Sequence, residues 1–226
     1  APWYEELAAA GDADAQAQFG ALCEQGLGSG GGAAADEGAA VRWYSLAAKQ
    51  GHPDAQDRLG ALLAASGAAQ DLRDAVHWWH AAARQGHGGA QCSLAQMLLR
   101  GLGTDRNEEE AFEWICRAAE QDVPEALYLA TVAYSIGVGT APDEHAALAM
   151  CARGAEQGHP ELQHRLGVHL ATGEGVPRDA RRAAQLFEQA AEQGHTAAAC
   201  NLGVLLAAGG PGLQRSSGEA RRRFEA

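Results

Sequence analysis

Histidines are the residues of this sequence whose type and spacing could support metal chemistry. Four of them directly follow a glycine at one recurring position, at residues 52, 87, 159 and 195. Imidazole is the commonest metal ligand in proteins, so four histidines in one setting raise the question of a bound ion. Each falls in a turn between successive repeats, about 10 Å from the next, so the four cannot share one ion. We therefore predict a structural role for them and no metal.

Two closer histidine pairs are weaker candidates. His164 and His169 are five residues apart on one expected helix, and about 500° of rotation places them on different faces. His77 and His80 are three apart and could supply half a zinc site, but no cysteine or acidic residue has the matching spacing. Neither pair leads us to predict a metal centre.

Enzyme motifs give no better match. Residues 26–31, GLGSGG, satisfy GxGxxG, but an expected helix precedes them where a dinucleotide site needs a strand. The sequence has no GxSxG, HExxH or Walker A motif. A Ser-x-x-Lys nucleophile pair fails as well, because Ser45 lies four residues before Lys49, the only lysine. We predict a non-enzymatic protein without a cofactor, and a metal- or ligand-dependent enzyme is the alternative.

A repeat of about 36 residues organises the chain. Its phase residue recurs at intervals of 40, 35, 36, 36 and 36, at Gly11, Gly51, Gly86, Asp122, Gly158 and Gly194. Small or apolar residues follow the phase residue at offsets 4, 8 and 12, which predicts an amphipathic first helix. Gly-x-Gly then marks a turn, and a second segment carrying a large apolar residue and a pair of small residues predicts a second helix.

The repeat predicts an all-α, right-handed α-solenoid of antiparallel helix pairs. We expect one repeat domain over residues 1–226, with about five full repeats and a partial repeat at each end. The incomplete terminal repeats allow end-to-end or dimeric self-association. A surplus of four residues in the first repeat falls in a surface loop over 28–33. The expected units are 1–10 (partial), 11–50, 51–85, 86–121, 122–157, 158–193 and 194–226 (partial).

This pattern resembles the Sel1-like repeat family, relatives of the tetratricopeptide repeat. The shared skeleton is Ala, Leu-Gly, Gly-x-Gly, Asp, Ala-x-x-Trp and Ala-Ala, closing on Gly. Residues 158–194 fit it nearly throughout, with Leu162 for Ala and Leu186 for Trp. The repeat that starts at Asp122 departs most, because Ala130-Thr131 replaces Leu-Gly and Met150 replaces Trp. The resemblance implies a scaffold for other proteins, common in bacterial signalling assemblies.

By analogy with tetratricopeptide arrays, the first helices line a concave face on which a protein or peptide binds. Offsets 3, 6, 10, 13 and 14 lie off the apolar stripe and are expected to face the partner, although such positions also vary on any unconstrained surface. We expect an apolar centre at Tyr128 with Ile136 and Leu99. In the best repeat, His164 and Glu161 do not follow from the skeleton. The predicted contact residues are Asp54, Asp57, Cys92, Gln96, Leu99, Arg100, Glu125, Tyr128, Val132, Ser135, Ile136, Glu161, His164, Val168 and Thr172.

Composition restricts the partner and the compartment. A net charge of −12 with a pI near 5.1 argues against nucleic acid, and no apolar run is long enough for membrane insertion. The five cysteines are odd in number and lack CxxC, which favours reduced thiols and a cytoplasmic setting. An exported protein remains an alternative, since the chain starts inside a repeat. So does a structural spacer between flanking domains.

Overall fold

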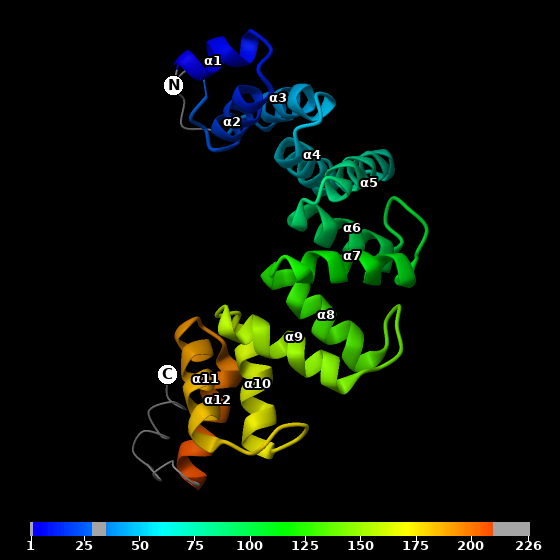
Figure 1. Ribbon diagram of the computed structural model, residues 1–226. Helices are drawn as coiled ribbons and strands as arrows, with labels where there is room; N and C mark the ends of the chain where they lie inside the picture. The colour runs from blue at the N-terminus through cyan, green and yellow to red at the C-terminus, as the bar shows by residue number, and fades with distance from the viewer. Residues whose placement is uncertain (1, 29–34, 210–226) are drawn as a thin grey trace. The chain divides into compact units, whose positions relative to one another are not determined.

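The computed structural model describes residues 2–28 and 35–209, and all regular structure within these ranges is helical (Figure 1). The predicted all-α fold of paired helices is confirmed. The predicted surplus over residues 29–33 and the partial repeat after Gly209 lie outside the described residues. The helices are α1 (Pro2–Ala9), α2 (Ala13–Glu24), α3 (Glu37–Lys49), α4 (Pro53–Ser66), α5 (Ala69–Arg84), α6 (Gly88–Arg100), α7 (Glu108–Glu120), α8 (Pro124–Ile136), α9 (Glu144–Glu156), α10 (Pro160–Thr172), α11 (Ala180–Glu192) and α12 (Thr196–Ala208).

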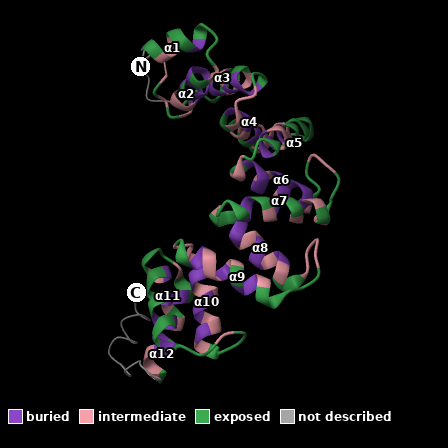
Figure 2. Ribbon diagram, in the orientation of Figure 1, coloured by how far each residue is buried: buried purple, intermediate pink, exposed green. Residues whose placement is uncertain are grey.

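The chain packs as two compact units, residues 1–118 and 119–226. The first holds α1 to α6 and nearly all of α7, and the second holds α8 to α12. Within each unit, successive helices pack against each other, for example α2 on α3, α4 on α5, α8 on α9 and α10 on α11. Figure 2 shows buried residues along the helix faces inside these pairs. No helix in the described ranges combines the length and apolar character needed to cross a bilayer.

Buried glutamines form a hydrogen-bonded row that the sequence did not lead us to predict. Gln16, Gln56, Gln91 and Gln163 are at most 4% exposed. Each donates its side-chain amide to the carbonyl oxygen eight residues earlier, at the end of the preceding second helix. The same carbonyls accept the backbone N–H of the phase glycine three residues on, so each glutamine amide fills a second acceptor position at the buried end of the helix. The donor–acceptor pairs are Gln16 to Ala8, Gln56 to Ala48, Gln91 to Ala83 and Gln163 to Ala155, at 3.0, 3.1, 3.1 and 3.4 Å.

The glycine of the Leu-Gly pair makes room for a large ring on the second helix. A methyl group added at Gly60 would lie 2.9 Å from the Trp79 indole, and one at Gly167 would lie 2.6 Å from the Phe187 ring. Gly20 stands against Tyr44 in the same way, at 2.9 Å. These contacts are shorter than normal van der Waals separations, so the rings can pack here only because glycine has no side chain.

In other repeats the side chains at these two positions differ in size in a compensating way. In the repeat starting at Gly86 they hold Ala95 and Ile115, which are 0% and 1% exposed. In the repeat starting at Asp122 they hold Thr131 and Cys151, which are 4% and 2% exposed. The first-helix residue therefore grows from Gly through Ala to Thr as the second-helix residue shrinks. A shared volume at each interface explains why Thr131 replaces glycine without breaking the repeat.

A second pair of side chains with compensating sizes lies between consecutive repeats in the second unit. Leu162 occupies a position that holds Ala55, Ala90 or Ala198 in other repeats. Its side chain is 0% exposed and fills the space above Gly154, where an added methyl group would lie 2.1 Å from Leu162 Cδ1. Gly154 replaces the first alanine of the Ala-Ala pair. The two departures from the repeat skeleton therefore compensate each other.

This pairing predicts a coupled pair of substitutions. Gly154→Ala should destabilise the chain by about 1–3 kcal/mol through overpacking against Leu162. Leu162→Ala alone should cost about 2–5 kcal/mol through the cavity it leaves. The double variant restores the Ala–Ala pairing of other repeats, so its loss should be smaller than the sum of the single losses by about 0.5–3 kcal/mol. Urea unfolding followed by circular dichroism measures all four proteins, and strictly additive losses would contradict the compensation.

Candidate functional site

Histidines begin the first helices of four repeats, directly after the phase glycine. In three of them Nδ1 accepts a hydrogen bond from the backbone N–H three residues on, as an N-cap. Nε2 of the same ring lies beside a carboxylate on the first helix of the preceding repeat. The three pairs are His52 with Asp14, His87 with Asp54 and His195 with Glu161, at 3.2, 3.1 and 2.9 Å.

The hydrogen bonds determine the tautomer of these rings. Because Nδ1 accepts from a backbone N–H, it carries no proton, and the proton resides on Nε2, which donates to the carboxylate. Each histidine is thus a neutral bridge between successive repeats. The carboxylate belongs to the same structural device, which corrects one expectation from the sequence. Glu161 was expected to be peculiar to its repeat, yet it plays the part of Asp14 and Asp54.

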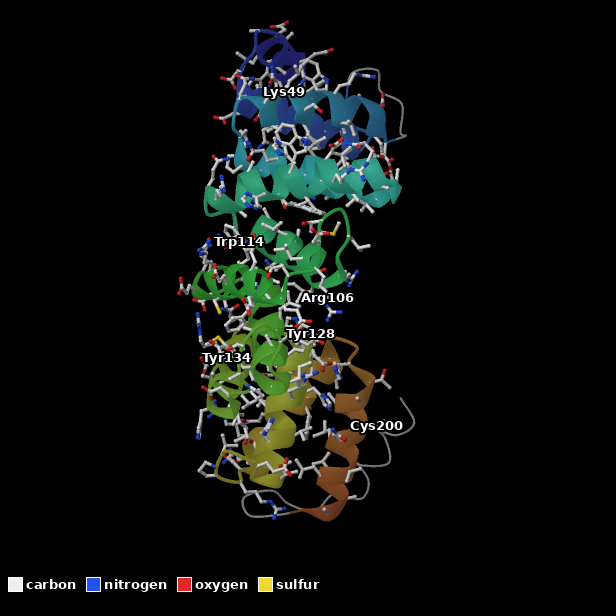
Figure 3. The ribbon with its side chains drawn as sticks, turned by 90° about the vertical axis from the view of Figure 1, so that its right-hand side faces the viewer. Lys49, Arg106, Trp114, Tyr128, Tyr134 and Cys200 are labelled. Carbon is white, nitrogen blue, oxygen red and sulfur yellow. The ribbon has the colours of Figure 1, made fainter. Side chains whose placement is uncertain are left out.

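The fourth histidine, His159, has a different environment. Its side chain makes no capping hydrogen bond, and its Nδ1 is buried without a hydrogen-bond partner. The ring stacks on Tyr128 of α8, labelled in Figure 3, with centroids 5.8 Å apart and planes inclined by 6°. The Arg165 guanidinium lies over the same tyrosine ring, 5.6 Å from its centroid. Tyr128 is therefore half-buried in a stack that joins α8 to α10.

His164 lies in the corresponding place one repeat later. Its ring is 4.6 Å from that of His195, with an interplanar angle of 29°. Its Nε2 is 2.9 Å from the Asn201 amide nitrogen on α12, and its Nδ1 is buried with no hydrogen-bond partner. Offset 6 of one repeat thus meets the histidine before the first helix of the next, both at Tyr128 and at His164.

A cavity of about 310 Å³ opens between α8, α9 and α10. Its polar lining comes mainly from α8 and α10, and its apolar lining mainly from α9. A protein site of this size lies at the small end of the range of about 300–1,000 Å³ seen for ligand pockets. The lining residues are Thr131, Ser135, Glu144, Ala147, Leu148, Cys151, Glu161, His164, Arg165, Val168 and His169.

The size exchange described above accounts for this cavity. Cys151 stands where Phe187, Trp79 and Tyr44 place a ring in other repeats. Thr131 restores part of the missing volume, and the remainder is open space that both residues line. The Cys151 thiol donates to the Leu162 carbonyl oxygen at 3.5 Å, and burial raises the pKa of Cys151 to about 11. The thiol is therefore protonated and a poor nucleophile at neutral pH.

The charged groups of the cavity are partly tied to one another. Although burial alone would raise the pKa of Glu161, hydrogen bonds from His195 and Arg165 lower it, so this carboxylate is ionised. The Arg165 Nε donates to Glu161 Oε1 at 2.9 Å. Burial, together with the neighbouring His195, lowers the pKa of His164, which favours the neutral imidazole.

The cavity brings together part of the predicted contact set. Ser135, Glu161, His164 and Val168 line it, and all four come from the predicted offsets. Tyr128 is not in the lining but contacts Arg165, which is, while Ile136 is 67% exposed at the end of α8. Glu125, Val132 and Thr172 are exposed or half-buried on α8 and α10 but do not line it.

The predicted residues of the first unit belong to α4 and α6. Asp54 accepts a hydrogen bond from His87 Nε2. Cys92 is 4% exposed, so its side chain packs inside the unit. Gln96 and Leu99 are half-buried and Arg100 is exposed. The predicted apolar centre combined Leu99 with two residues of the second unit, and it stays a prediction.

The contribution of α9 to the cavity was not expected from the sequence. Glu144, Ala147, Leu148 and Cys151 line the cavity from a second helix, whereas only first helices were expected to reach a partner. The sequence feature that could have indicated the cavity is Cys151, which stands where other repeats have an aromatic residue. To infer the cavity from it, one must know that Thr131 contacts Cys151 across the two helices, and the repeat pattern alone does not show this contact.

In the first unit, Asp57 occupies offset 6, as Tyr128 and His164 do in the second. Burial raises the pKa of its carboxyl, and the adjacent His87 and the Trp79 indole oppose that rise. A methyl group added at Gly89 would touch both the His87 ring and the Asp57 carboxylate, at 3.2 and 3.6 Å. Asp57 therefore lies near the ring of the capping histidine of the next repeat, as Tyr128 and His164 lie near His159 and His195.

Comparison with known proteins agrees with the repeat phase. The model of the family described as Sel1 repeat matches residues 13–52, 53–87, 89–123, 124–159 and 160–195. No curated protein sequence matches the chain.

Solved structures share the fold over nearly the whole chain. A Sel1 repeat protein from Oxalobacter formigenes is 31% identical with a TM-score of 0.84, over 99% of this chain and 64% of its own. A protective antigen of uropathogenic Escherichia coli that displays an SLR fold is 27% identical, also with a TM-score of 0.84, over 99% of this chain and 47% of its own. The chain thus spans less than two thirds of either protein. An immunity protein from Pseudomonas aeruginosa, 18% identical with a TM-score of 0.54 over 94% and 80% of the two chains, shares the fold alone.

Because the pKa of Asp57 is raised, we predict that replacing it with the neutral asparagine stabilises the protein by an amount that depends on pH. Between the ordinary pKa of aspartate and the raised one, the folded chain binds more protons than the unfolded chain, so stability falls as pH rises through the folded pKa. Asp57→Asn should therefore raise the Tm at pH 7, and the difference from the unsubstituted protein should shrink toward pH 3. Thermal unfolding across that range measures it.

Asp74→Asn, at an exposed position of α5, is the matched control for Asp57→Asn and should change the Tm little at any pH. A Tm of Asp57→Asn that is lowered at pH 7, or raised equally at pH 7 and pH 3, would show that burial of the carboxylate does not cost stability.

Proposed function

Because the chain belongs to the Sel1 repeat family, whose members generally mediate protein–protein interactions, we propose that it is a non-catalytic scaffold that binds a protein or peptide. The cavity between α8, α9 and α10 is the anchor point of the second unit. The observation that carries this proposal is an interface that lacks the ring found at the same place in other repeats and leaves about 310 Å³ open.

The lining of the cavity suits the side chain of an incoming peptide. Ala147, Leu148 and Val168 offer apolar contact, and Thr131 and Ser135 offer hydroxyl groups beside it. A central pocket that takes one anchor residue, with polar groups around it, is the usual arrangement of a peptide hot spot. The volume accommodates one or two side chains and is small for most cofactors. The predicted residues of the first unit would add contacts along a longer partner.

The geometry supports the two alternative functions, an enzyme and a structural spacer, less well. An enzyme needs an acid, base or nucleophile free to act on a substrate. Here the Cys151 thiol is held protonated, and Glu161 and His195 are engaged in the bridge between repeats. A spacer between flanking domains has no use for an open interface, because an unfilled cavity weakens packing.

Filling the cavity tests the proposal. The double substitution Thr131→Gly with Cys151→Phe copies the Gly167–Phe187 pair and should place a ring in the cavity while keeping the helices packed. Peptides selected by display on the unsubstituted protein serve as probes. Their affinity for the double variant should fall at least about tenfold, since loss of a buried anchor typically costs 2 kcal/mol or more. Isothermal titration measures it, with circular dichroism to check the helices.

Val204→Phe is the matched control, because it adds the same phenyl group at a 59% exposed position of α12 outside the cavity. Its affinity for the selected peptides should equal that of the unsubstituted protein. Peptides that bind the double variant as tightly as the unsubstituted protein would remove the cavity from the binding surface.

A further inference from the structure

We propose that Glu161, His164 and His195 form a binding site for one Zn²⁺ ion in the second unit. One donor atom from each of the three residues lies within 4.8 Å of the other two. Two imidazoles and a carboxylate are a ligand set that Zn²⁺ commonly takes, with a remaining position for water or for a group of a bound chain. The sequence led us to predict no metal, because it did not reveal that stacking of repeats brings His164 against His195.

His164 is the residue that distinguishes this site from the ordinary bridge between repeats. Its Nε2 is held by the Asn201 side chain at 2.9 Å, while its Nδ1 is buried and has no hydrogen-bond partner. A buried polar nitrogen without a partner is costly in a protein interior. Metal-binding histidines commonly place one nitrogen on the ion and donate the N–H of the other to a neighbouring acceptor. In the metal-free chain the Asn201 amide nitrogen faces Nε2, so zinc binding at Nδ1 requires this amide to turn its oxygen toward an Nε2–H group. We infer that Nδ1 is the coordinating nitrogen.

The other bridges do not bring a third donor within this distance. In the pair His52 with Asp14, offset 6 is Ala17, whose side chain has no ligand atom. In the pair His87 with Asp54, offset 6 is Asp57, and these three residues do not meet the distance for a shared ion. Among the residues that the structure describes, the group of three that meets the distance for a shared ion is Glu161, His164 and His195. The site should therefore bind one equivalent of zinc and should not recur along the chain.

Zinc competes with the helix cap that His195 provides. Nδ1 of His195 accepts from the Ala198 N–H at 3.1 Å, so the ring proton is on Nε2, where it donates to Glu161. Coordination through Nε2 requires the proton to move to Nδ1, and the Ala198 N–H then loses its side-chain acceptor and keeps the His195 carbonyl oxygen at 3.1 Å. Metal binding and the bridge between repeats are thus mutually exclusive at this position. The Ala198 amide reports which of the two is present.

Arg165 opposes the ion. Its guanidinium binds Glu161 Oε1, which leaves Oε2 for the metal but places a positive charge beside it. Removing that charge should strengthen zinc binding, whereas a merely structural role for Glu161 predicts no such gain. Arg165→Gln should therefore raise the affinity for zinc. Nonspecific binding by surface carboxylates elsewhere on the chain would not change with this substitution.

Zinc titration of the full chain, after dialysis against a chelator, tests the site. We expect one saturable equivalent by competition with a chromophoric chelator. His164→Tyr copies the Tyr128–His159 stack, so it keeps a ring against His195 and removes the nitrogen ligand. It should abolish the tight equivalent. Asn201→Ala should weaken it about 10–100-fold, Arg165→Gln should tighten it, and His52→Ala, which removes a bridge without a third donor, should leave it unchanged.

A ¹H–¹⁵N NMR titration supplies the second readout. Zinc should shift the Ala198 amide in the unsubstituted protein and leave it in place in His164→Tyr. A chain that binds no zinc, or binds it equally well after His164→Tyr, overturns the proposal. If His164→Tyr does not fold, the Asn201→Ala and Arg165→Gln affinities decide instead, and unchanged values for both overturn it. These outcomes do not depend on peptide binding at the cavity.

Discussion

Neighbouring helices in this chain approach so closely that the two side chains at each contact must share a limited volume. Gly60 faces Trp79 and Gly167 faces Phe187, where even one added methyl group would overlap the ring. Close packing of this kind tolerates exchange of volume across an interface far better than a net gain or loss. The constraint explains why departures from the skeleton come in pairs, as with Leu162 above Gly154. The constraint also means that each substitution away from the skeleton can be interpreted. If the facing side chain does not restore the lost volume, a cavity remains.

Space of this kind is present at the α8–α9 interface. Thr131 adds less volume than the replacement of a ring by Cys151 removes, and the difference remains as the cavity. Hydrogen-bonded bridges hold the surrounding elements in register despite that loss. His195 caps α12 and binds Glu161 on α10, and Gln163 ties α10 to the end of α9. The repeat can therefore carry an open interface because neighbouring contacts do not rely on it.

Much of the fold follows from the sequence, because helix periodicity and the turn glycines repeat in phase. The predicted first and second helices of the repeats agree with the structure. The hydrogen-bonded glutamine row was missed, since Gln16 and Gln56 read as polar surface until the carbonyl groups they satisfy are located. The site was predicted in part. His164 and Val168 were found from their offset on the first helix, but Cys151 lies on the other helix and depends on a contact between segments 20 residues apart.

The proposed metal site shows how a repeat can gain chemistry without a new fold. The pair of histidine and carboxylate is required in several repeats for capping and for joining neighbours, as His52 and Asp14 do. Its position brings offset 6 of the same helix to the capping ring, so whichever residue stands there inherits a preformed partner. Tyrosine gives a stack at Tyr128, and histidine gives a third donor at His164. A single substitution at offset 6 thus changes the chemistry while the structural pair supplies two of the ligands. Because Glu161 and His195 already form the bridge and the cap without a metal, release of the ion would restore both contacts.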